Sequence, residues 1–188
     1  MIVVVAALVS ACGGADAPDH AATTFQPAGA PYAFDVPPGL STRDVAPYDH
    51  AIAGGTTPYA TEVGGAAARD ATAVLLAIPV GEQLPDDARA LARRFELATR
   101  NVNNAGGGVV GATTPWTVGG HAGFRLAAAD ATTEYRGAAV GTWFVLETCQ
   151  ASTVAARRRA CDAVDRTLRL RAAPPPPASP GGRTVTIR

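Results

Sequence analysis

The sequence predicts an α+β fold, in which an antiparallel β-sheet of about six strands is flanked by two main helices. Three observations lead to this prediction. Short apolar stretches predict strands, two longer segments with apolar residues every three or four positions predict helices, and the later strands are joined by connections short enough for hairpins. The chain has 188 residues, which suits one domain with terminal tails.

We place this domain at residues 32–171. Residues 32–36 alternate in polarity and stop at Pro37-Pro38-Gly39, which predicts a strand followed by a turn. Residues 49–53 predict a second strand. Residues 71–80 form a continuous apolar run with Pro79 near its end, which is typical of a central strand buried on both faces.

A helix is predicted over residues 86–102. Asp86 and Asp87 begin it, where carboxylates interact favourably with the helix dipole. The glycine-rich segment 106–111 follows it and matches the pattern G-x-G-x-x-G. A dinucleotide site needs a strand before this pattern and a helix after it, so we predict only a loop here. The apolar stripe of the helix consists of Ala88, Leu91, Phe95, Ala98 and Val102.

The second half of the domain predicts further strands and a second helix. The strands are expected at residues 116–118, 121–127 and 134–149, with a turn at 130–133. The helix is expected over residues 153–170, with Ser152 or Thr153 as its N-cap. Its apolar stripe consists of Val154, Cys161, Val164 and Leu168.

The N-terminal segment predicts export. Residues 1–9 are all apolar, and small residues follow them. Such a run is too short to span a bilayer and is typical of the apolar region of a signal peptide, although no basic residue precedes it. The alternative is an ordinary apolar strand with a structural cysteine. Residues 12–31 and 172–188 are interpreted as a flexible tether and a Pro-rich tail.

Val9-Ser10-Ala11-Cys12 resembles the lipobox of bacterial lipoproteins. The resemblance implies that residues 1–11 are a signal peptide and that Cys12 is the lipidated N-terminus of the mature chain. It also implies an anchor at the outer face of the cell membrane, or in the outer membrane of a cell that has two.

Together with the lipobox, the order of the elements resembles the PsbP-like fold, which small bacterial lipoproteins of the LpqN and LpqT type share. The residues that carry this resemblance are Phe34 to Leu40, Trp143 to Cys149, Cys161 and Leu168. The resemblance implies a non-enzymatic role in the cell envelope, and it brings no catalytic residues with it.

Cys149 and Cys161 are the cysteines that remain when Cys12 carries a lipid. An even number of cysteines in an exported protein predicts a disulfide. The helical stripe also turns Cys161 towards the strand that contains Cys149. Two free buried thiols are the alternative.

The charged residues exclude several classes of function. All 16 basic residues are arginine, so no lysine can serve in a phosphate loop, a Schiff base or general-base catalysis. The formal net charge is zero, whereas proteins that bind nucleic acid usually carry a basic excess. This net charge is the sum of −8 over residues 12–87 and +8 over residues 88–188.

An arginine cluster lies at the end of the domain. Two aspartates within it predict ion pairs one helical turn apart, Asp162–Arg166 and Asp165–Arg169, which would make this a solvated helix face. The alternative is contact with anionic headgroups or with an acidic partner. The arginines of the cluster are Arg157, Arg158, Arg159, Arg166, Arg169 and Arg171.

No catalytic, metal or cofactor site is predicted. The histidines are too widely spaced for a metal site, and the serines outside the signal lie in no nucleophile motif. These residues are His20, His50, His121, Ser41, Ser152 and Ser179.

We therefore predict a lipid-anchored, non-catalytic binding or accessory module, whose partner is an envelope protein or an apolar or lipid ligand. A structural spacer within a complex is one alternative. A hydrolase with a dispersed active site is the other, and it would draw on His121, Asp130, Glu134 and Glu147.

Overall fold

The structure is a computed structural model. It describes residues 23–46, 48–50, 55–65, 71–80, 84–85, 87–103, 110–128 and 132–174.

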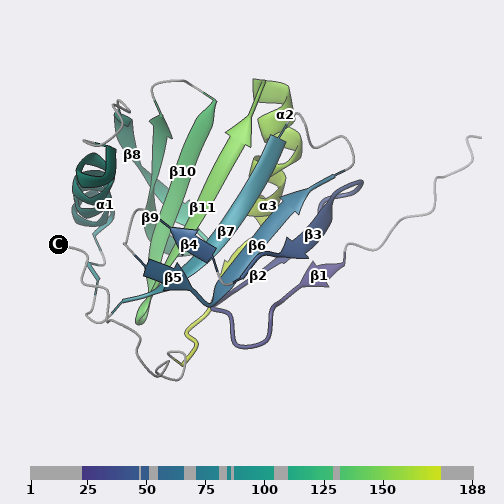
Figure 1. The fold of residues 1–188 in the computed structure, drawn as a ribbon, viewed down its shortest axis with the longest axis horizontal. Coiled ribbons are helices and arrows are strands. Elements are labelled where there is room, and N and C mark those ends of the chain that lie inside the picture. Colours follow the sequence, from purple (N-terminus) through teal and green to yellow (C-terminus); the bar gives the residue numbers. More distant parts are fainter. Residues whose placement is uncertain are drawn as a thin grey trace, which may run out of the picture.

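A seven-stranded antiparallel sheet forms the centre of the molecule (Figure 1). The apolar run predicted as a central strand lies inside this sheet, where both of its edges are paired. In spatial order the strands are β3 (Ser41–Asp44), β6 (Tyr59–Gly64), β7 (Ala71–Pro79), β11 (Trp143–Ala151), β10 (Thr133–Val140), β9 (His121–Ala128) and β8 (Val110–Val118).

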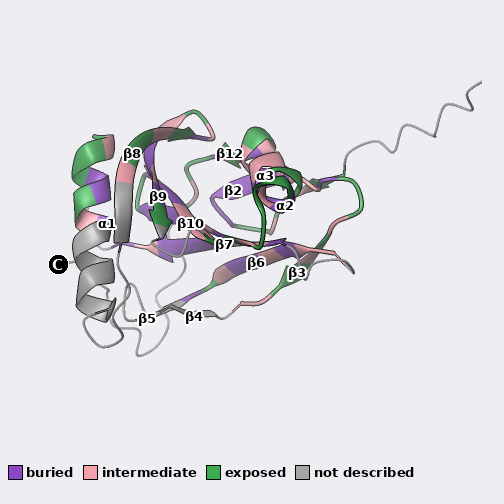
Figure 2. Ribbon diagram, turned by 90° about the horizontal axis from the view of Figure 1, so that it is seen from above, coloured by how far each residue is buried: buried purple, intermediate pink, exposed green. Residues whose placement is uncertain are grey.

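Smaller elements cover the two faces of this sheet (Figure 2). On one side lie two short helices and a three-stranded sheet of order β1-β2-β12, and on the other lie the β4–β5 hairpin and, beside β8 and β9, helix α1. The bounds are β1 (Thr24–Phe25), β2 (Tyr32–Asp35), β4 (Tyr48–His50), β5 (Gly55–Thr57), α1 (Ala88–Asn103), α2 (Val154–Arg159), α3 (Cys161–Thr167) and β12 (Arg169–Leu170).

Alternation along the strands divides the core into two apolar clusters. On β11, Trp143 and Val145 face the side covered by α2, α3 and the three-stranded sheet, whereas Phe144 and Leu146 face the side covered by α1. Successive strand residues point to opposite faces, so a strand covered on both sides is apolar throughout. This explains the apolar run of β7 and the apolar residues 143–146 that begin β11.

The α+β prediction is confirmed, and so are its most strongly patterned elements. These are the strand before Pro37, the central strand β7 and the helix α1, which begins two residues later than expected. Asp87 precedes the first turn of α1, and its Oδ1 atom accepts a hydrogen bond from the Ala90 amide at 2.8 Å. Thr153 caps α2 in the same way through the Ala156 amide, at 3.0 Å.

The second helix differs from its prediction. It is broken at Ala160 into α2 and α3, and it ends at Thr167 instead of residue 170. Leu168 has an extended backbone, so the next two residues can pair with β2 as strand β12. Pairing with a strand more than 130 residues away in sequence therefore overrides the local helical pattern.

The segment 134–149 is a hairpin, not the single strand that we predicted. Val140 pairs with Trp143 across a two-residue turn. The first turn residue, Gly141, has a φ of +58°, a conformation that glycine adopts without steric strain. Two strands of the central sheet, β3 and β6, were not predicted at all, because neither has a marked apolar pattern.

The folded region also extends beyond the predicted domain of residues 32–171. Strand β1 pairs with β2, and Ala30 is fully buried, so residues from 24 onwards are not a free tether. At the other end, Trp143 Nε1 donates a hydrogen bond to the Ala173 carbonyl at 3.1 Å. The signal peptide, Cys12, His20, Ser179 and residues 175–188 lie outside the described residues, as do residues 51–53, 104–109 and 129–131.

Candidate functional site

The most unusual feature of the fold is an arginine buried at the centre of the sheet. Arg136 lies on β10, and 1% of its side chain is exposed. Its Nε atom donates to Glu134 Oε1 at 2.7 Å, and its Nη2 atom donates to Asp162 Oδ1. Its Nη1 atom lies 3.6 Å from both Glu147 Oε2 and Asp165 Oδ2, too far for hydrogen bonds but within ion-pair range.

The strand register brings the sheet residues of this site together. Glu134 and Arg136 are two positions apart on β10, so both point to the face beneath α3. Glu147 of β11 and Arg125 of β9 lie directly opposite Arg136 on its two neighbouring strands. Like charges opposite each other destabilise a sheet, and Glu134 separates Arg125 from Arg136 by accepting hydrogen bonds from both.

Further groups complete this site, which we call the buried charge network. Arg125 Nη2 lies 2.6 Å from Glu134 Oε2, and Arg157 Nη1 lies 3.4 Å from the same oxygen. Trp116 Nε1 donates to Asp165 Oδ2 at 3.1 Å, and the Arg125 guanidinium lies 5.1 Å from the centre of the Trp116 ring. The network comprises Trp116, Arg125, Glu134, Arg136, Glu147, Arg157, Asp162 and Asp165.

A cysteine pair joins the two elements that enclose the network. The sulfur atoms of Cys149 on β11 and Cys161 on α3 lie 2.00 Å apart, which fits the predicted disulfide. Cys149 lies opposite Glu134 in the strand register, and Cys161 precedes Asp162. The disulfide therefore holds the start of α3 against the sheet beside the network.

Burial and charge shift the pKa values of the carboxyl groups in different directions. Burial raises the pKa of Glu147 to about 8, because the charge of Arg136 only partly offsets the loss of solvation. Burial likewise raises the pKa of Asp165. Burial alone would raise the pKa of Glu134 too, but hydrogen bonds from Arg125 and Arg136 lower it.

These shifts balance the charges of the network. Three arginines face four carboxyl groups, and a proton on Glu147 at neutral pH makes the numbers of positive and negative charges equal. Neither carboxyl oxygen of Glu147 has a hydrogen bond among the described residues, which also favours the uncharged form. At most 2% of the Glu134, Arg136 or Glu147 side chains is exposed, so no substrate reaches them in this conformation.

The residues of the hydrolase alternative do not form one site in the described part of the chain. Glu134 and Glu147 lie in the buried network. His121 begins β9, four residues or about 13 Å of strand before Arg125. Asp130 lies outside the described residues. Nor does any group of three or more His, Cys, Asp or Glu side chains in the described ranges have the arrangement of a metal site.

The predicted arginine cluster separates into bound and exposed members. Arg157 joins the network, Arg169 Nη2 donates to Asp35 Oδ1 at 2.7 Å, and Arg171 donates to the Ala30 carbonyl at 3.2 Å. The remaining members are Arg158, Arg159 and Arg166, which are exposed and have no ion-pair partner among the residues that the structure describes.

The two ion pairs expected within the second helix do not form. Asp162 and Asp165 turn inwards to Arg136, because the buried guanidinium needs carboxylate partners more than an exposed arginine does. Arg169 lies beyond the end of α3 and pairs with β2 instead.

Sequence reasoning did not select Arg136, Arg125 or Trp116. One signal was available: Glu147 directly follows the apolar residues 143–146 of β11, and a charged residue in a strand buried on both faces requires a partner. The identity of that partner depends on the strand register, which the sequence alone does not provide.

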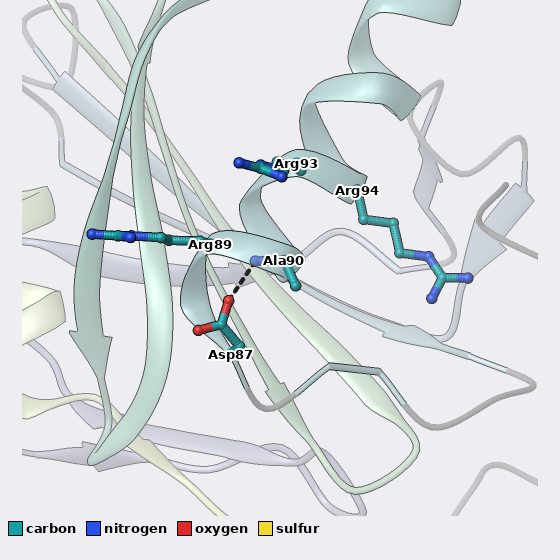
Figure 3. A pocket seen from close by; sticks show the side chains of 5 residues that line it. All are labelled: Asp87, Arg89, Ala90, Arg93 and Arg94. Carbon is teal, nitrogen blue, oxygen red and sulfur yellow. Dashed lines mark hydrogen bonds between the residues drawn. The ribbon is translucent and has the colours of Figure 1, made fainter.

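A shallow hollow on α1 is the other charged feature (Figure 3). Asp87, which caps the helix, lies beside it, and the arginine side chains extend in different directions rather than converging on one point (Figure 3). The lining residues are Asp87, Arg89, Ala90, Arg93 and Arg94. Among the described residues, those of the hydrolase alternative do not line this hollow.

No helix in the described part of the chain is both long enough and apolar enough to cross a membrane.

Comparison with known proteins identifies the fold. The solution structure of cyanobacterial PsbP (CyanoP) from Synechocystis sp. PCC 6803 matches with a TM-score of 0.51 and 14% sequence identity, over 84% of this chain and 98% of that one. The chain therefore has a PsbP-like fold. No protein-family model matches the sequence, and the curated proteins include no match.

Proposed function

We propose that this chain is a lipid-anchored accessory module of the cell envelope, which binds a partner and catalyses no reaction. The observation that carries the proposal is the buried charge network. Its acids and bases are the groups best suited to proton transfer, yet they are paired with one another beneath α3. A general acid or base must reach the proton of its substrate, and Glu134 and Glu147, of which at most 2% is exposed, cannot do so.

The network instead supports a structural role. It connects β9, β10 and β11 of the sheet with α2 and α3, and the disulfide reinforces the same contact. A rigid scaffold of this kind suits a protein whose function depends on its surface. The PsbP-like fold is consistent with such a module, although at 14% identity it identifies no partner.

The lipobox Val9-Ser10-Ala11-Cys12 supports the anchor. Twelve residue steps separate Cys12 from Thr24 in β1, so the extended segment reaches about 40 Å at most. A lipid on Cys12 would hold the domain within that distance of the bilayer. The disulfide supports an oxidising location outside the cytoplasm.

The anchor is tested by fractionating cells that produce the full chain or its Cys12→Ala variant. We expect the parent chain to stay with the membranes after high-salt and carbonate washing, and the variant to be released. Ser10→Ala keeps the cysteine and a small neighbour, so it serves as the matched control and should remain bound. A Cys12→Ala chain that resists both washes would contradict the lipid anchor.

The accessory role is tested by crosslinking in intact cells, followed by mass spectrometry. We expect reproducible adducts with an envelope component from the parent chain, and none from a variant whose fold is disrupted. Hydrolysis of a model ester, amide or phosphate by the purified chain that Glu134→Gln abolishes would instead establish an enzyme.

A further inference from the structure

We propose that the outer surface of α2 and α3 binds anionic phospholipid headgroups through Arg158, Arg159 and Arg166. We call these three residues the arginine patch. Its orientation towards the bilayer rests on the lipid anchor of the proposed function, whereas its affinity for anionic lipid does not.

The first argument is the direction of the acidic side chains. Asp162 and Asp165, the acids of α3, bind Arg136 in the interior, and the nearby Asp35 binds Arg169. Each of these carboxylates is therefore paired with an arginine outside the patch, and 30% of the Asp162 side chain and 10% of the Asp165 side chain stay exposed. The arginine patch keeps three positive charges without a carboxylate partner among the described residues, which makes it complementary to an anionic surface.

The second argument is the arrangement of the patch. Figure 1 shows α2 and α3 stacked end to end on one side of the central sheet. Ala156, Ala160 and Val164 face the core, so the arginines occupy the outer side, which is exposed in Figure 2. Arg158 and Arg159 end α2 and Arg166 lies in the last turn of α3, and all three are exposed.

The third argument is an apolar side chain beside the arginines. Val154 is 55% exposed, and it is the large hydrophobic residue that stands out as exposed in the described part of the chain. It lies one helical turn before Arg158, so the two share one side of α2. Basic residues next to an exposed apolar one are typical of surfaces that bind at the membrane interface.

The fourth argument is where the N-terminal segment leaves the fold. Thr24 Oγ1 donates to Asp35 Oδ1 at 2.7 Å, and the Asp35 amide donates to Thr167 Oγ1 at 3.1 Å. The segment that leads to Cys12 therefore starts beside the end of α3, next to Arg166. A tether attached at this point presents the bilayer to the arginine patch at a high effective concentration, which favours lipid over a freely diffusing acidic protein.

The size of the effect follows from the charges. Each arginine near an anionic surface contributes about 1 kcal/mol, or about fivefold in binding. Three arginines therefore give about a 100-fold preference for anionic over neutral vesicles. Salt should weaken this preference, because exposed charges are screened.

The experiment measures vesicle binding by the full chain carrying Cys12→Ala, so no lipid on the protein contributes. Vesicles of phosphatidylcholine alone are compared with vesicles that contain about 30% phosphatidylglycerol, an anionic lipid. The affinity for the anionic vesicles is divided by the affinity for the neutral vesicles, because this ratio cancels any apolar contribution from the N-terminal residues. We expect the triple variant Arg158→Gln, Arg159→Gln, Arg166→Gln to lower this ratio about 100-fold.

A second triple variant controls for net charge. Arg43→Gln, Arg89→Gln and Arg93→Gln also remove three exposed arginines, but from β3 and α1. We expect this control to keep most of the anionic preference and both variants to unfold at similar urea concentrations. The proposal is overturned if the parent shows no anionic preference, if the patch variant retains it, or if both variants lose it equally. Because Cys12 is absent throughout, these outcomes are independent of the fractionation test of the anchor.

Discussion

The two faces of the seven-stranded sheet are stabilised by different interactions. Beneath α1, Phe95 contacts Phe124 and Phe144 at ring-centre distances of 4.9 and 5.8 Å. Beneath α3, the corresponding space holds the buried charge network around Arg136. The first face depends on buried apolar area, which has no preferred direction, whereas the second depends on hydrogen bonds and ion pairs of defined geometry.

The difference determines how each face responds to change. An aromatic core loses stability in proportion to the volume removed or added. A buried charge network loses far more when a single partner is removed, because the remaining charges stay buried without compensation. Four predictions test this contrast.

The largest effect is expected from Arg136→Met, which preserves much of the side-chain volume but removes the charge. The carboxyl groups around it would lose their common partner, so we expect the free energy of unfolding to fall by about 3–5 kcal/mol. Urea denaturation measures the change. The control is Arg43→Met, which breaks the exposed ion pair with Glu62 and should cost less than about 1 kcal/mol. Equal losses in the two variants would refute the contrast.

The disulfide should have the next largest effect. It closes a loop with a sequence separation of 12, and replacing both Cys149 and Cys161 by alanine should destabilise the fold by about 3 kcal/mol. We expect amide hydrogen exchange to increase in α3 more than in α1. Uniform acceleration of exchange would show that the two faces unfold as one unit and are not independently stabilised.

Crowding the aromatic face should cost about 1–3 kcal/mol. A Cβ atom at Gly137 would lie 2.8 Å from Phe144 Cζ and 2.9 Å from Phe124 Cε1, so Gly137→Ala forces the rings apart. Adding Phe124→Leu provides room, so the double variant should lose less than the sum of the single losses. Strictly additive unfolding free energies would argue against direct contact.

The fourth prediction concerns pH, and its effect is gradual, because no single pH unit changes the free energy of unfolding by more than about 1.4 kcal/mol. The pKa of Glu147 rises from 4.5 to about 8 on folding, so the folded state binds this proton more tightly. Stability from the neutral group is complete below about pH 4.5 and is lost as the pH rises to about 8, with a slope of up to about 1.4 kcal/mol per pH unit. The pKa values of Asp35 and Glu134 are lowered, so protonation of these two groups changes the stability only below this pH range.

We expect Glu147→Gln to flatten the stability profile between these limits, as measured by urea denaturation at each pH. A parent profile without this decline would mean that Glu147 is already charged at neutral pH.

The two faces also differ in how much of them the sequence predicts. The α1 face follows from local patterns: Leu91 and Phe95 are one helical turn apart, and both are buried where the periodicity places them. The apolar run of β7 likewise occupies the interior of the sheet. Local periodicity is sufficient here because each residue needs only an apolar neighbour.

The α3 face could not be predicted in the same way. Whether Asp162 pairs with Arg166 one turn away or with Arg136 on another strand depends on the distance between α3 and the sheet. The break at Ala160 has no proline or glycine to signal it, and β12 exists only because β2 is available as a partner. Such choices depend on contacts between distant parts of the chain, and local propensity does not report them.

The three-stranded sheet has a consequence for the time course of folding. Asp35 on β2 binds Thr24 of β1 and Arg169 of β12, and the second contact spans 134 residues. Strand β2 is synthesised early but completes its pairing only when residue 170 is available, which takes roughly 10 s at ordinary synthesis rates. During that interval Tyr32 and Phe34, which are fully buried in the finished fold, lack their final cover. We therefore expect these two side chains to be exposed to aggregation until residues 169–170 of β12 have been synthesised.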